Sequence, residues 1–293
     1  MKKLLIVGAG GYIGRHMINH FQERALGSYH SRENYGIQLD ILKDRIFECL
    51  PRPDNISHAL VLAGQTKPAE IVKDPTKAHA LNVEATWQLI EDLIEFNIVP
   101  IFTSNDSLFG HNLGPFSETD PTNPQVIYGK FKLEIEHRLL NISQTSLIIR
   151  IPRVYGLSLG DGSLITRLYE KIKIGGNMAV ASDQLFSPLY LGDMAKAIDQ
   201  AIKSNLSGLY HLGGDEIVTH ADIAYKICAE LSKYHSVDIK IQEKSINDFV
   251  TYETRPLDLS MDSGKLKNTL GLSFISITEA INKIILSDKK VTN

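Results

Sequence analysis

The sequence predicts an α/β protein with a doubly wound parallel sheet and a smaller C-terminal α+β lobe. The apolar run at residues 3–7 indicates a buried parallel strand, and the glycine-rich turn GAGGYIG follows it at residues 8–14. Strand and helix patterns then alternate as far as residue 151, which is typical of a parallel sheet of the Rossmann type. After Gly156 the alternation loosens, and this change predicts the second lobe.

The composition is that of an ordinary globular protein. The chain has 293 residues, of which 43% are hydrophobic and 22% charged, and its formal net charge is −3. This charge gives no attraction to nucleic acid or to an anionic membrane. Cys49 and Cys228 fit no disulfide framework and no metal spacing, and no stretch approaches the ~20 apolar residues of a membrane span. We therefore expect a cytoplasmic protein without a bound metal, a nucleic-acid partner or a membrane span.

The GAGGYIG turn has the strand–turn–helix context of a dinucleotide-binding site. Gly8 permits the tight turn, Gly11 lets the backbone approach a pyrophosphate at the helix N-terminus, and Gly14 allows close packing of helix on strand. Tyr12 and Ile13 lie between the last two glycines, and we expect them at the same site. The alternative is a structural turn without a ligand.

The residues after the second predicted strand, 25–29, bear on the choice of cofactor. An acidic residue there would bind the ribose 2′-hydroxyl of NAD, and the sequence has none. Ser31 and Arg32 can instead hold a 2′-phosphate, so NADP(H) is favoured over NAD(H). The alternative is that Arg32 is a solvated loop residue. Further on, Asp40 can meet the adenine amine, with Ile41 beside it.

Several predicted strands deliver residues to one edge of the sheet. In parallel sheets, ligands bind beyond the carboxyl ends of the strands. Small residues at positions 63 and 64 suit close passage of a cofactor. The segments that we expect at this edge are the glycine turn, Ala63–Gly64 after strand 58–62, Thr103–Ser107 after strand 99–103, and Arg150–Gly156 at the end of strand 146–151.

The segment after Pro124 is predicted to be a helix that carries Tyr128 and Lys132. Residues four apart lie on the same helix face. A cation beside a phenol lowers the phenol pKa, which makes Tyr128 a candidate proton donor to a substrate carbonyl. The alternative is an exposed helix pair that stabilises the protein by only a few tenths of a kcal/mol.

The remaining pattern predicts the domain organisation. Residues 1–155 are expected to form the dinucleotide-binding domain, with residues 184–212 returning to it, and residues 156–293 are expected to form most of a substrate-binding lobe. The helices that we expect outside the segments above lie at about 77–97, 164–174, 192–204, 220–232 and 277–285, and the further strands at about 209–212 and 238–241.

Several motifs resemble the extended short-chain dehydrogenase/reductases, and within them the dTDP-4-dehydrorhamnose reductase family. Besides GAGGYIG, they are SNDSLFG (104–110), PFSETDPTNPQVIYGKFKLEIE (115–136), RIPRVYG (150–156), DQLFSP (183–188), GLYHLGG (208–214) and RPLDLSMDSGKL (255–266). The resemblance implies that NADPH delivers hydride to a keto carbon of a nucleotide-linked deoxysugar. It also implies that Tyr128 protonates the oxyanion, that Lys132 binds the nicotinamide ribose, and that a homodimer is a common assembly.

The chain departs from the family pattern in two places. Asn105 stands where the family has a catalytic threonine, with Ser104 and Ser107 as nearby hydroxyls, and an amide cannot relay a proton as a hydroxyl can. Arg153 stands where the reductases often carry an aromatic residue near the sugar. A guanidinium there favours a more acidic or differently substituted sugar, or it pairs with a surface carboxylate.

Further residues are assigned to the substrate by resemblance. Asp106 and Ser107 belong to the segment that borders the substrate in the family. Arg255 belongs to a block that lies near the nucleotide in relatives, where it would contact the substrate diphosphate or form a structural ion pair.

Three functions are consistent with these observations. The first is an NADPH-dependent keto-deoxysugar nucleotide reductase in surface polysaccharide synthesis. The second is an epimerase or dehydratase that holds NAD, against which the missing acidic residue argues. The third is a non-catalytic NADP-binding regulatory subunit, such as the β subunit of methionine adenosyltransferase that the family includes. Asn105 motivates this third function, and the presence of Tyr128 and Lys132 argues against it.

Overall fold

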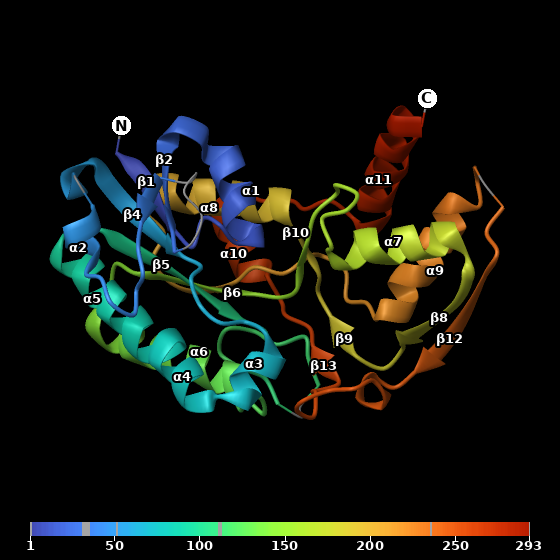
Figure 1. The fold of residues 1–293 in the computed structure, drawn as a ribbon, viewed down its shortest axis with the longest axis horizontal. Coiled ribbons are helices and arrows are strands. Elements are labelled where there is room, and N and C mark those ends of the chain that lie inside the picture. Colours follow the sequence, from blue (N-terminus) through green and yellow to red (C-terminus); the bar gives the residue numbers. More distant parts are fainter. Residues whose placement is uncertain (1, 31–35, 51, 111–112, 235, 293) are drawn as a thin grey trace. The chain divides into compact units, whose positions relative to one another are not determined.

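The computed structural model describes residues 2–30, 36–50, 52–110, 113–234 and 236–292 (Figure 1). The chain divides into two compact units, each built from three segments. The first unit comprises Met1–Leu108, Thr122–Arg150 and Ala195–Tyr210, and the second comprises Phe109–Pro121, Ile151–Met194 and His211–Asn293.

A seven-stranded sheet forms the centre of the first unit, in the order β11-β6-β5-β4-β1-β2-β3. The pairings from β3 to β5 are all parallel, as the sequence predicted. β1 lies between β2 and β4, so the strand order reverses there, and ligands bind at such a reversal. The strands are β1 (Lys3–Val7), β2 (Ala25–Tyr29), β3 (Gly36–Gln38), β4 (Ile56–Val61), β5 (Val99–Asn105), β6 (Leu147–Ile151) and β11 (Gly208–His211).

Helices pack on this sheet and bury apolar side chains against it. Ile90, Phe102 and Ile135 are fully or almost fully buried in a core that joins the sheet to its helices. The helices are α1 (Tyr12–Phe21), α2 (Ile46–Cys49), α3 (Pro68–Lys73), α4 (Pro75–His79), α5 (Thr86–Glu95), α6 (Ile127–Ile142) and α8 (Leu191–Lys203), with short 3₁₀ turns η1 (Gln22–Arg24) and η2 (Pro53–Asn55).

The helix predicted at 77–97 is interrupted by a π-helical segment, η3 (Ala80–Ala85). The Thr86 hydroxyl donates to the Leu81 carbonyl five residues back, at 2.9 Å, which fits the wider turn. Asn82 is buried within this segment, and its side chain bonds to the backbone of Gln65. The amide therefore braces the turn after β4.

The second unit is a smaller α+β body, as the sequence predicted. Its core joins Tyr155 and Tyr169 to apolar residues of its helices. The helices are α7 (Leu164–Ile174), α9 (His220–Leu231), α10 (Gly264–Leu270) and α11 (Ile277–Thr292), and η4 (Ile246–Asp248) is a 3₁₀ turn. Parallel two-stranded sheets pair β10 (Leu189–Tyr190) with β7 (Val154–Tyr155), β12 (Ile239–Lys244) with β8 (Gly176–Ala181), and β13 (Asp258–Leu259) with β9 (Leu185–Phe186).

The observed units differ from the predicted boundaries. Phe109–Pro121 belongs to the second unit because the Phe116 N–H donates to Ser260 at 2.9 Å and the Phe116 carbonyl accepts from Asp262 at 2.8 Å. The segment that returns to the first unit is 195–210, where 184–212 was expected. Short strand pairings hold residues 185–190 in the second unit, and these pairings leave little periodic signal.

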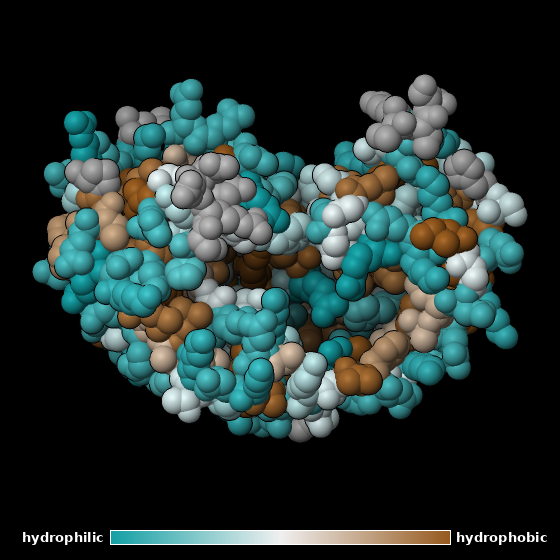
Figure 2. All heavy atoms as spheres, in the orientation of Figure 1, coloured by the Kyte–Doolittle hydropathy of each residue, from teal (hydrophilic) through white to brown (hydrophobic). Residues whose placement is uncertain are grey.

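The lengths of the helices and the polarity of one face bear on membrane contact. Among the residues that the structure describes, no helix is long and apolar enough to cross a membrane. On the face drawn in Figure 2, hydrophilic side chains dominate over α3 and α4 of the first unit.

Candidate active site

A cavity of about 450 Å³ lies at the carboxyl edge of the sheet in the first unit. It is lined by the glycine turn, by the ends of β2 and β4, and by the segment after β3. It brings together six of the residues predicted to bind the cofactor, namely Gly8, Gly11, Asp40, Ile41, Ala63 and Gly64. Tyr12, Ile13 and Gly14 lie at the start of α1, which follows the glycine turn. Thr103 lies on β5, the strand next to β4.

The glycine turn has the geometry that its sequence predicts. Gly8 has a φ of +94°, a conformation that side chains disfavour, and a Cβ there would lie 2.9 Å from the Ala63 nitrogen. A Cβ on Gly14 would lie 2.7 Å from Ala9 Cα and would overlap the Gly8 carbonyl oxygen. Gly11 is the N-cap of α1, without a side-chain cap and without an acidic residue in the first turn. The N-terminus of α1 therefore suits an anionic group.

The turn after β4, which also lines the cavity, is held by Asn82. Its Oδ1 accepts from the Gln65 N–H at 3.0 Å, and its Nδ2 donates to the Gln65 carbonyl at 3.1 Å. Gly64 has a φ of +154°, and a Cβ there would lie 2.6 Å from Asn82 Oδ1. The buried amide thus fixes the backbone along which a cofactor would pass.

Asp40 lies in this cavity with an imidazole and an ammonium group beside it. His30 Nε2 lies 3.5 Å and Lys43 Nζ 3.3 Å from its Oδ2. Burial would raise the pKa of Asp40, but the hydrogen bond from the Leu42 N–H and the Lys43 ammonium lower it. Asp40 is therefore an ionised acceptor. Ser31 and Arg32, which were predicted to hold a 2′-phosphate, lie outside the described residues.

Tyr128 and Lys132 occupy one face of α6 beside β5. Lys132 Nζ donates to the Thr103 carbonyl at 2.8 Å and lies 4.5 Å from the centre of the Phe102 ring. It lies 5.6 Å from the centre of the Tyr128 ring. The Thr103 hydroxyl donates to the Val61 carbonyl at 2.8 Å, which ties β5 to the strand that leads into Ala63. The predicted shared face is confirmed.

The predicted effect of Lys132 on the tyrosine is wrong for the chain without ligands. Part of the Tyr128 side chain is exposed, yet burial raises the pKa of its hydroxyl, and the nearby Asp106 carboxylate raises it further. Burial lowers the pKa of Lys132 to about 8, against the opposing charge of Glu136. Desolvation outweighs the attraction between the two groups, so Tyr128 keeps its proton at neutral pH.

Polar side chains follow β5 toward Tyr128. Ser104 Oγ and Asn105 Oδ1 are buried, and neither has a hydrogen-bond partner among the described residues. Ser107 Oγ donates to Asp106 Oδ1 at 3.4 Å. Buried polar atoms in native proteins are usually paired, so each of these two atoms is a candidate to bond a polar ligand. Successive strand residues face opposite sides of a sheet, so the two atoms need not serve the same ligand.

The second unit contains a cluster of cationic side chains at the start of α9. Arg153 Nη1 lies 3.4 Å from His220 Nε2, while His220 Nδ1 is buried without a partner among the described residues. Burial lowers the pKa of His220 to about 4, helped by the charges of Arg153, Arg255 and Arg167. The two predicted arginines therefore lie near the same histidine, and this cluster can bind an anion.

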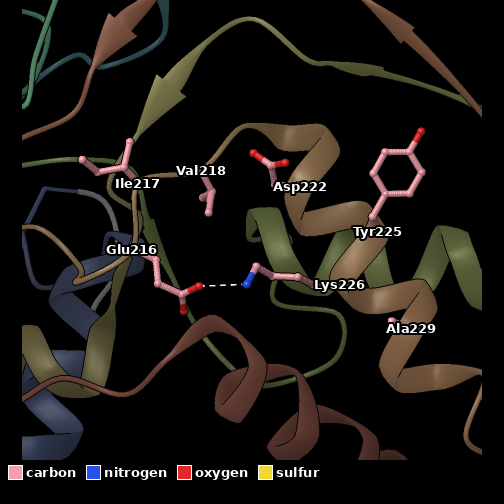
Figure 3. A pocket seen from close by; sticks show the side chains of 7 residues that line it. All are labelled: Glu216, Ile217, Val218, Asp222, Tyr225, Lys226 and Ala229. Carbon is pink, nitrogen blue, oxygen red and sulfur yellow. Dashed lines mark ion pairs between the residues drawn. The ribbon is translucent and has the colours of Figure 1, made fainter.

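The same unit also contains a hollow of about 690 Å³, in which polar groups bond to other groups of the unit (Figure 3). Lys226 Nζ pairs with Glu216 across it at 2.9 Å. Asp222 accepts from the N–H and hydroxyl of Thr219 in a capping box, and the Tyr225 hydroxyl donates to Glu243. Its polar groups thus serve the unit itself, and no predicted site residue lines it.

One group of possible metal ligands occurs within the described part of the chain. His79, Glu84 and Glu134 bring their ligand atoms together. Arg138 Nη2 donates to Glu84 at 3.2 Å and to Glu134 at 2.6 Å. A guanidinium therefore already pairs with both carboxylates.

The chain matches the family model of the RmlD substrate binding domain over residues 1–289. It belongs to this family. Among curated relatives, it is 29% identical over 284 residues to the dTDP-4-dehydrorhamnose reductase of Aggregatibacter actinomycetemcomitans, covering 93% of this chain and 94% of the relative. It is 26% identical over 278 residues to methionine adenosyltransferase 2 subunit beta of Xenopus tropicalis, covering 91% of this chain and 82% of the relative.

Solved structures share the fold of this chain. The dTDP-4-dehydrorhamnose reductase of Bacillus anthracis in complex with NADP superposes with a TM-score of 0.81 at 20% identity, covering 98% of this chain and all of that one. The predicted family and the predicted Rossmann-type fold class are thus confirmed.

Sequence reasoning missed several residues of this candidate site. Ser28, His30 and Leu81 line the cavity at the carboxyl edge of the sheet, and of these only Ser28 carries a local signal, as a small residue near the end of β2. His220 and Arg167 join Arg153 and Arg255 only through the tertiary structure. The capping box of Thr219 and Asp222 predicts a helix start, but not the neighbours of His220.

Proposed function

We propose that this protein uses NADPH to reduce the keto group of a nucleotide-linked deoxysugar, within the biosynthesis of deoxysugars for surface polysaccharides. The assignment to sugar-nucleotide reductases, and thus to oxidoreductases, is borne out by its relatives. The observation that carries the proposal is the position of Tyr128 and Lys132. Lys132 bonds to Thr103, and Thr103 bonds to the strand that leads into the nucleotide cavity.

The residues of the first unit fit a nicotinamide dinucleotide. Gly8, Gly11 and Gly64 leave room for its backbone, and the uncapped N-terminus of α1 suits its pyrophosphate. When bound, NADPH supplies the hydride. Lys132 would hold the nicotinamide ribose while it stays bonded to Thr103.

The proton donor and the oxyanion donors come from α6 and the end of β5. Because the pKa of Tyr128 is raised, its hydroxyl arrives protonated and can give its proton to the developing oxyanion. Asn105 would donate from its amide Nδ2 to the substrate carbonyl, while its buried Oδ1, which has no partner among the described residues, would accept from a substrate hydroxyl. Ser104 carries a second buried hydroxyl without a partner among the described residues. Asp106 and Ser107 would contact the sugar.

The preference for NADP(H) over NAD(H) is part of the proposal. The sequence offers Ser31 and Arg32 for a 2′-phosphate, and no acidic residue directly follows β2. The relative from Bacillus anthracis was solved in complex with NADP. Asp40, which accepts from Leu42 and pairs with Lys43, would then meet the adenine amine.

The cationic cluster of the second unit supports a nucleotide-sugar substrate. Arg255 and Arg167 form no ion pair with any described residue, and Arg153 lies against His220. Guanidinium groups bind phosphate oxygens through charge-assisted hydrogen bonds. We therefore assign Arg153 and Arg255 to the substrate, with the diphosphate as the group that they bind.

A regulatory function is the second candidate. The relative from Xenopus tropicalis is named as a subunit of methionine adenosyltransferase, and Asn105 replaces a hydroxyl that the resemblance leads us to expect. A pure binding protein needs no buried proton-donor pair, so Tyr128 and Lys132 favour the reductase. We place the protein in the cytoplasm, where its free thiols Cys49 and Cys228 stay reduced, and we propose a homodimer.

The test is NADPH oxidation with a panel of keto-deoxysugar nucleotides, by wild type and Tyr128→Phe. We expect turnover by the wild type with at least one sugar and none by the variant, while both bind NADPH equally. A fluorescence titration with NADPH and NADH should show a preference for NADPH that Arg32→Ala removes. Equal oxidation by wild type and variant with every sugar would refute the reductase. A preference for NADH would favour the epimerase or dehydratase.

A further inference from the structure

Glu136 and Arg150 form a buried ion pair behind the proposed catalytic residues. Arg150 Nε lies 3.0 and 3.2 Å from the two Glu136 carboxylate oxygens, and Nη2 lies 2.7 Å from Oε2. The Arg150 side chain is 4% exposed and the Glu136 side chain 1%. The pair joins α6 to β6, and both carboxylate oxygens are engaged by one guanidinium.

The position of Glu136 along α6 connects this pair to the site. Tyr128, Lys132 and Glu136 are spaced four residues apart, so they follow one another along the same helix face. Lys132 is itself 8% exposed. Its ammonium points to the Thr103 carbonyl at 2.8 Å and to the Phe102 ring at 4.5 Å.

A lysine and a glutamate at this spacing would ordinarily pair with each other. Here the Glu136 carboxylate is held by Arg150, and the Lys132 ammonium is held by Thr103. A buried ammonium still needs a nearby negative charge to stay protonated, because desolvation favours its neutral form. Glu136 supplies that charge from one helical turn away and raises the pKa of Lys132 against the effect of burial.

The charged and titratable groups around Lys132 come from three elements. On α6 they are Tyr128 and Glu136, on β6 Arg150, and after β5 Asp106, whose charge acts on Tyr128. Arg150 and Glu136 pair with each other, and Asp106 is the further carboxylate of this group.

We infer that Glu136 and Arg150 are positioning residues for Lys132. The Glu136 carboxylate keeps the buried ammonium charged, and Arg150 keeps that carboxylate from drawing the ammonium away from Thr103, Tyr128 and the cofactor. The consequence for catalysis rests on the proposed function, but the effect on Lys132 does not.

The test measures the ionisation of Lys132 directly. In protein with ¹³C-labelled lysine, the signal of Lys132 is identified by its loss in Lys132→Met and followed by NMR against pH. Glu136→Gln keeps the shape and removes the charge, so the Lys132 pKa should fall by about one unit. Arg150→Gln removes the opposite charge and should move the Lys132 pKa upward. A pair that only stabilised the fold would not shift the Lys132 pKa in opposite directions in these two variants.

Two controls keep the test interpretable. Asp92→Asn breaks another ion pair of the first unit, with Arg45, and should leave the Lys132 pKa unchanged. If Glu136→Gln does not fold because Arg150 is left unpaired, Glu136→Gln/Arg150→Met removes both charges without leaving an unpaired one. The Glu136 charge acts on Lys132 from one helical turn away and outweighs that of Arg150, so the Lys132 pKa should still fall in this double variant, but by less than in Glu136→Gln.

The outcomes separate this inference from the proposed function. An unchanged Lys132 pKa in folded Glu136→Gln, or in the folded double variant, would overturn the inference whatever the protein catalyses. NADPH binding, followed by nicotinamide fluorescence from pH 6 to 10, should weaken as the pH rises and Lys132 loses its proton. In Glu136→Gln this weakening should begin at a lower pH than in wild type. A fall in the Lys132 pKa together with no NADPH binding by wild type would support the role of Glu136 and refute the reductase.

Discussion

Lys132 Nζ donates a hydrogen bond of 2.8 Å to the carbonyl oxygen of Thr103. The bond joins the helix that carries Tyr128 to the strand next to the nucleotide cavity, through a backbone atom that no substitution of Thr103 can remove. It uses one of three ammonium protons, which leaves donors for a ribose. The orientation of Lys132 is therefore set before any cofactor binds.

Burial of this ammonium predicts a pH dependence of stability. The pKa of Lys132 is about 8 in the folded protein, below its value of 10.5 in the unfolded chain. Between these values the unfolded chain binds more protons, so the free energy of unfolding contributed by Lys132 rises with pH. Denaturant unfolding at pH 7.5 and 9.5 should show wild type gaining stability relative to Lys132→Met. A constant difference between the two proteins would contradict the lowered pKa.

Tyr128→Phe should abolish turnover without weakening NADPH binding. The raised pKa of Tyr128 means that its proton stays in place up to strongly alkaline pH. The loss of activity of wild type at high pH should therefore follow Lys132, near pH 8, and not the phenol. The pH profile of kcat/KM tests this. Activity that persists unchanged well above that pH would show that a neutral Lys132 suffices.

Gly14 and Gly11 should respond differently to alanine. A Cβ at Gly14 would overlap the Gly8 carbonyl, so Gly14→Ala should destabilise the fold by about 1–3 kcal/mol. At Gly11 a Cβ would lie 3.3 Å from the same oxygen, so Gly11→Ala should fold but bind NADPH more weakly. Thermal unfolding and a cofactor titration on both variants distinguish the two effects. Equal cofactor affinity in Gly11→Ala and wild type would mean that no pyrophosphate passes there.

Asn105 should be a donor to the substrate carbonyl. Asn105→Ala should lower kcat by about 10²–10³-fold, the usual loss for one oxyanion donor. Asn105→Thr restores the hydroxyl that the resemblance implies, so its kcat should match or exceed that of wild type. Steady-state kinetics measure both. An alanine variant with full activity would exclude Asn105 from the reaction.

Arg255→Ala should raise KM for the nucleotide sugar and leave the affinity for NADPH unchanged. The guanidinium has no carboxylate partner among the described residues, so its removal should cost little stability. Lys226→Ala, in the hollow of Figure 3, is the matched control because it removes a cation of the same unit that already has a partner. An equal rise of KM in both variants would point to a general effect of charge.

Local rules predicted those parts of the site that depend on neighbours in sequence. The turn around Gly8, the start of α1 and the shared face of Tyr128 and Lys132 all follow from spacing. The raised pKa of Tyr128 could not be predicted from spacing, because the effect of burial depends on everything packed around the hydroxyl. His220 could not be grouped with Arg153 and Arg255 either, since they are separated by 67 and 35 positions along the chain.

The fold likewise has parts that local patterns predicted and parts that they did not. The parallel sheet was predictable because buried strands alternate with amphipathic helices. The membership of residues 109–121 in the second unit was not, because it rests on backbone hydrogen bonds between Phe116 and residues 260–262. Pairings so far apart in the chain leave no periodic signal.

The π-helical segment η3 limits how the length of this chain can vary. A π-turn accommodates one residue more than an α-turn, and here it aims Asn82 at the backbone of Gln65. Deleting one residue between positions 80 and 85 would give a more regular helix, yet it would rotate Asn82 away from that turn. A shortened helix should thus be stable in itself while the wall of the nucleotide cavity loosens. Insertions and deletions in this helix are therefore constrained by the cavity that it braces, more than by the helix itself.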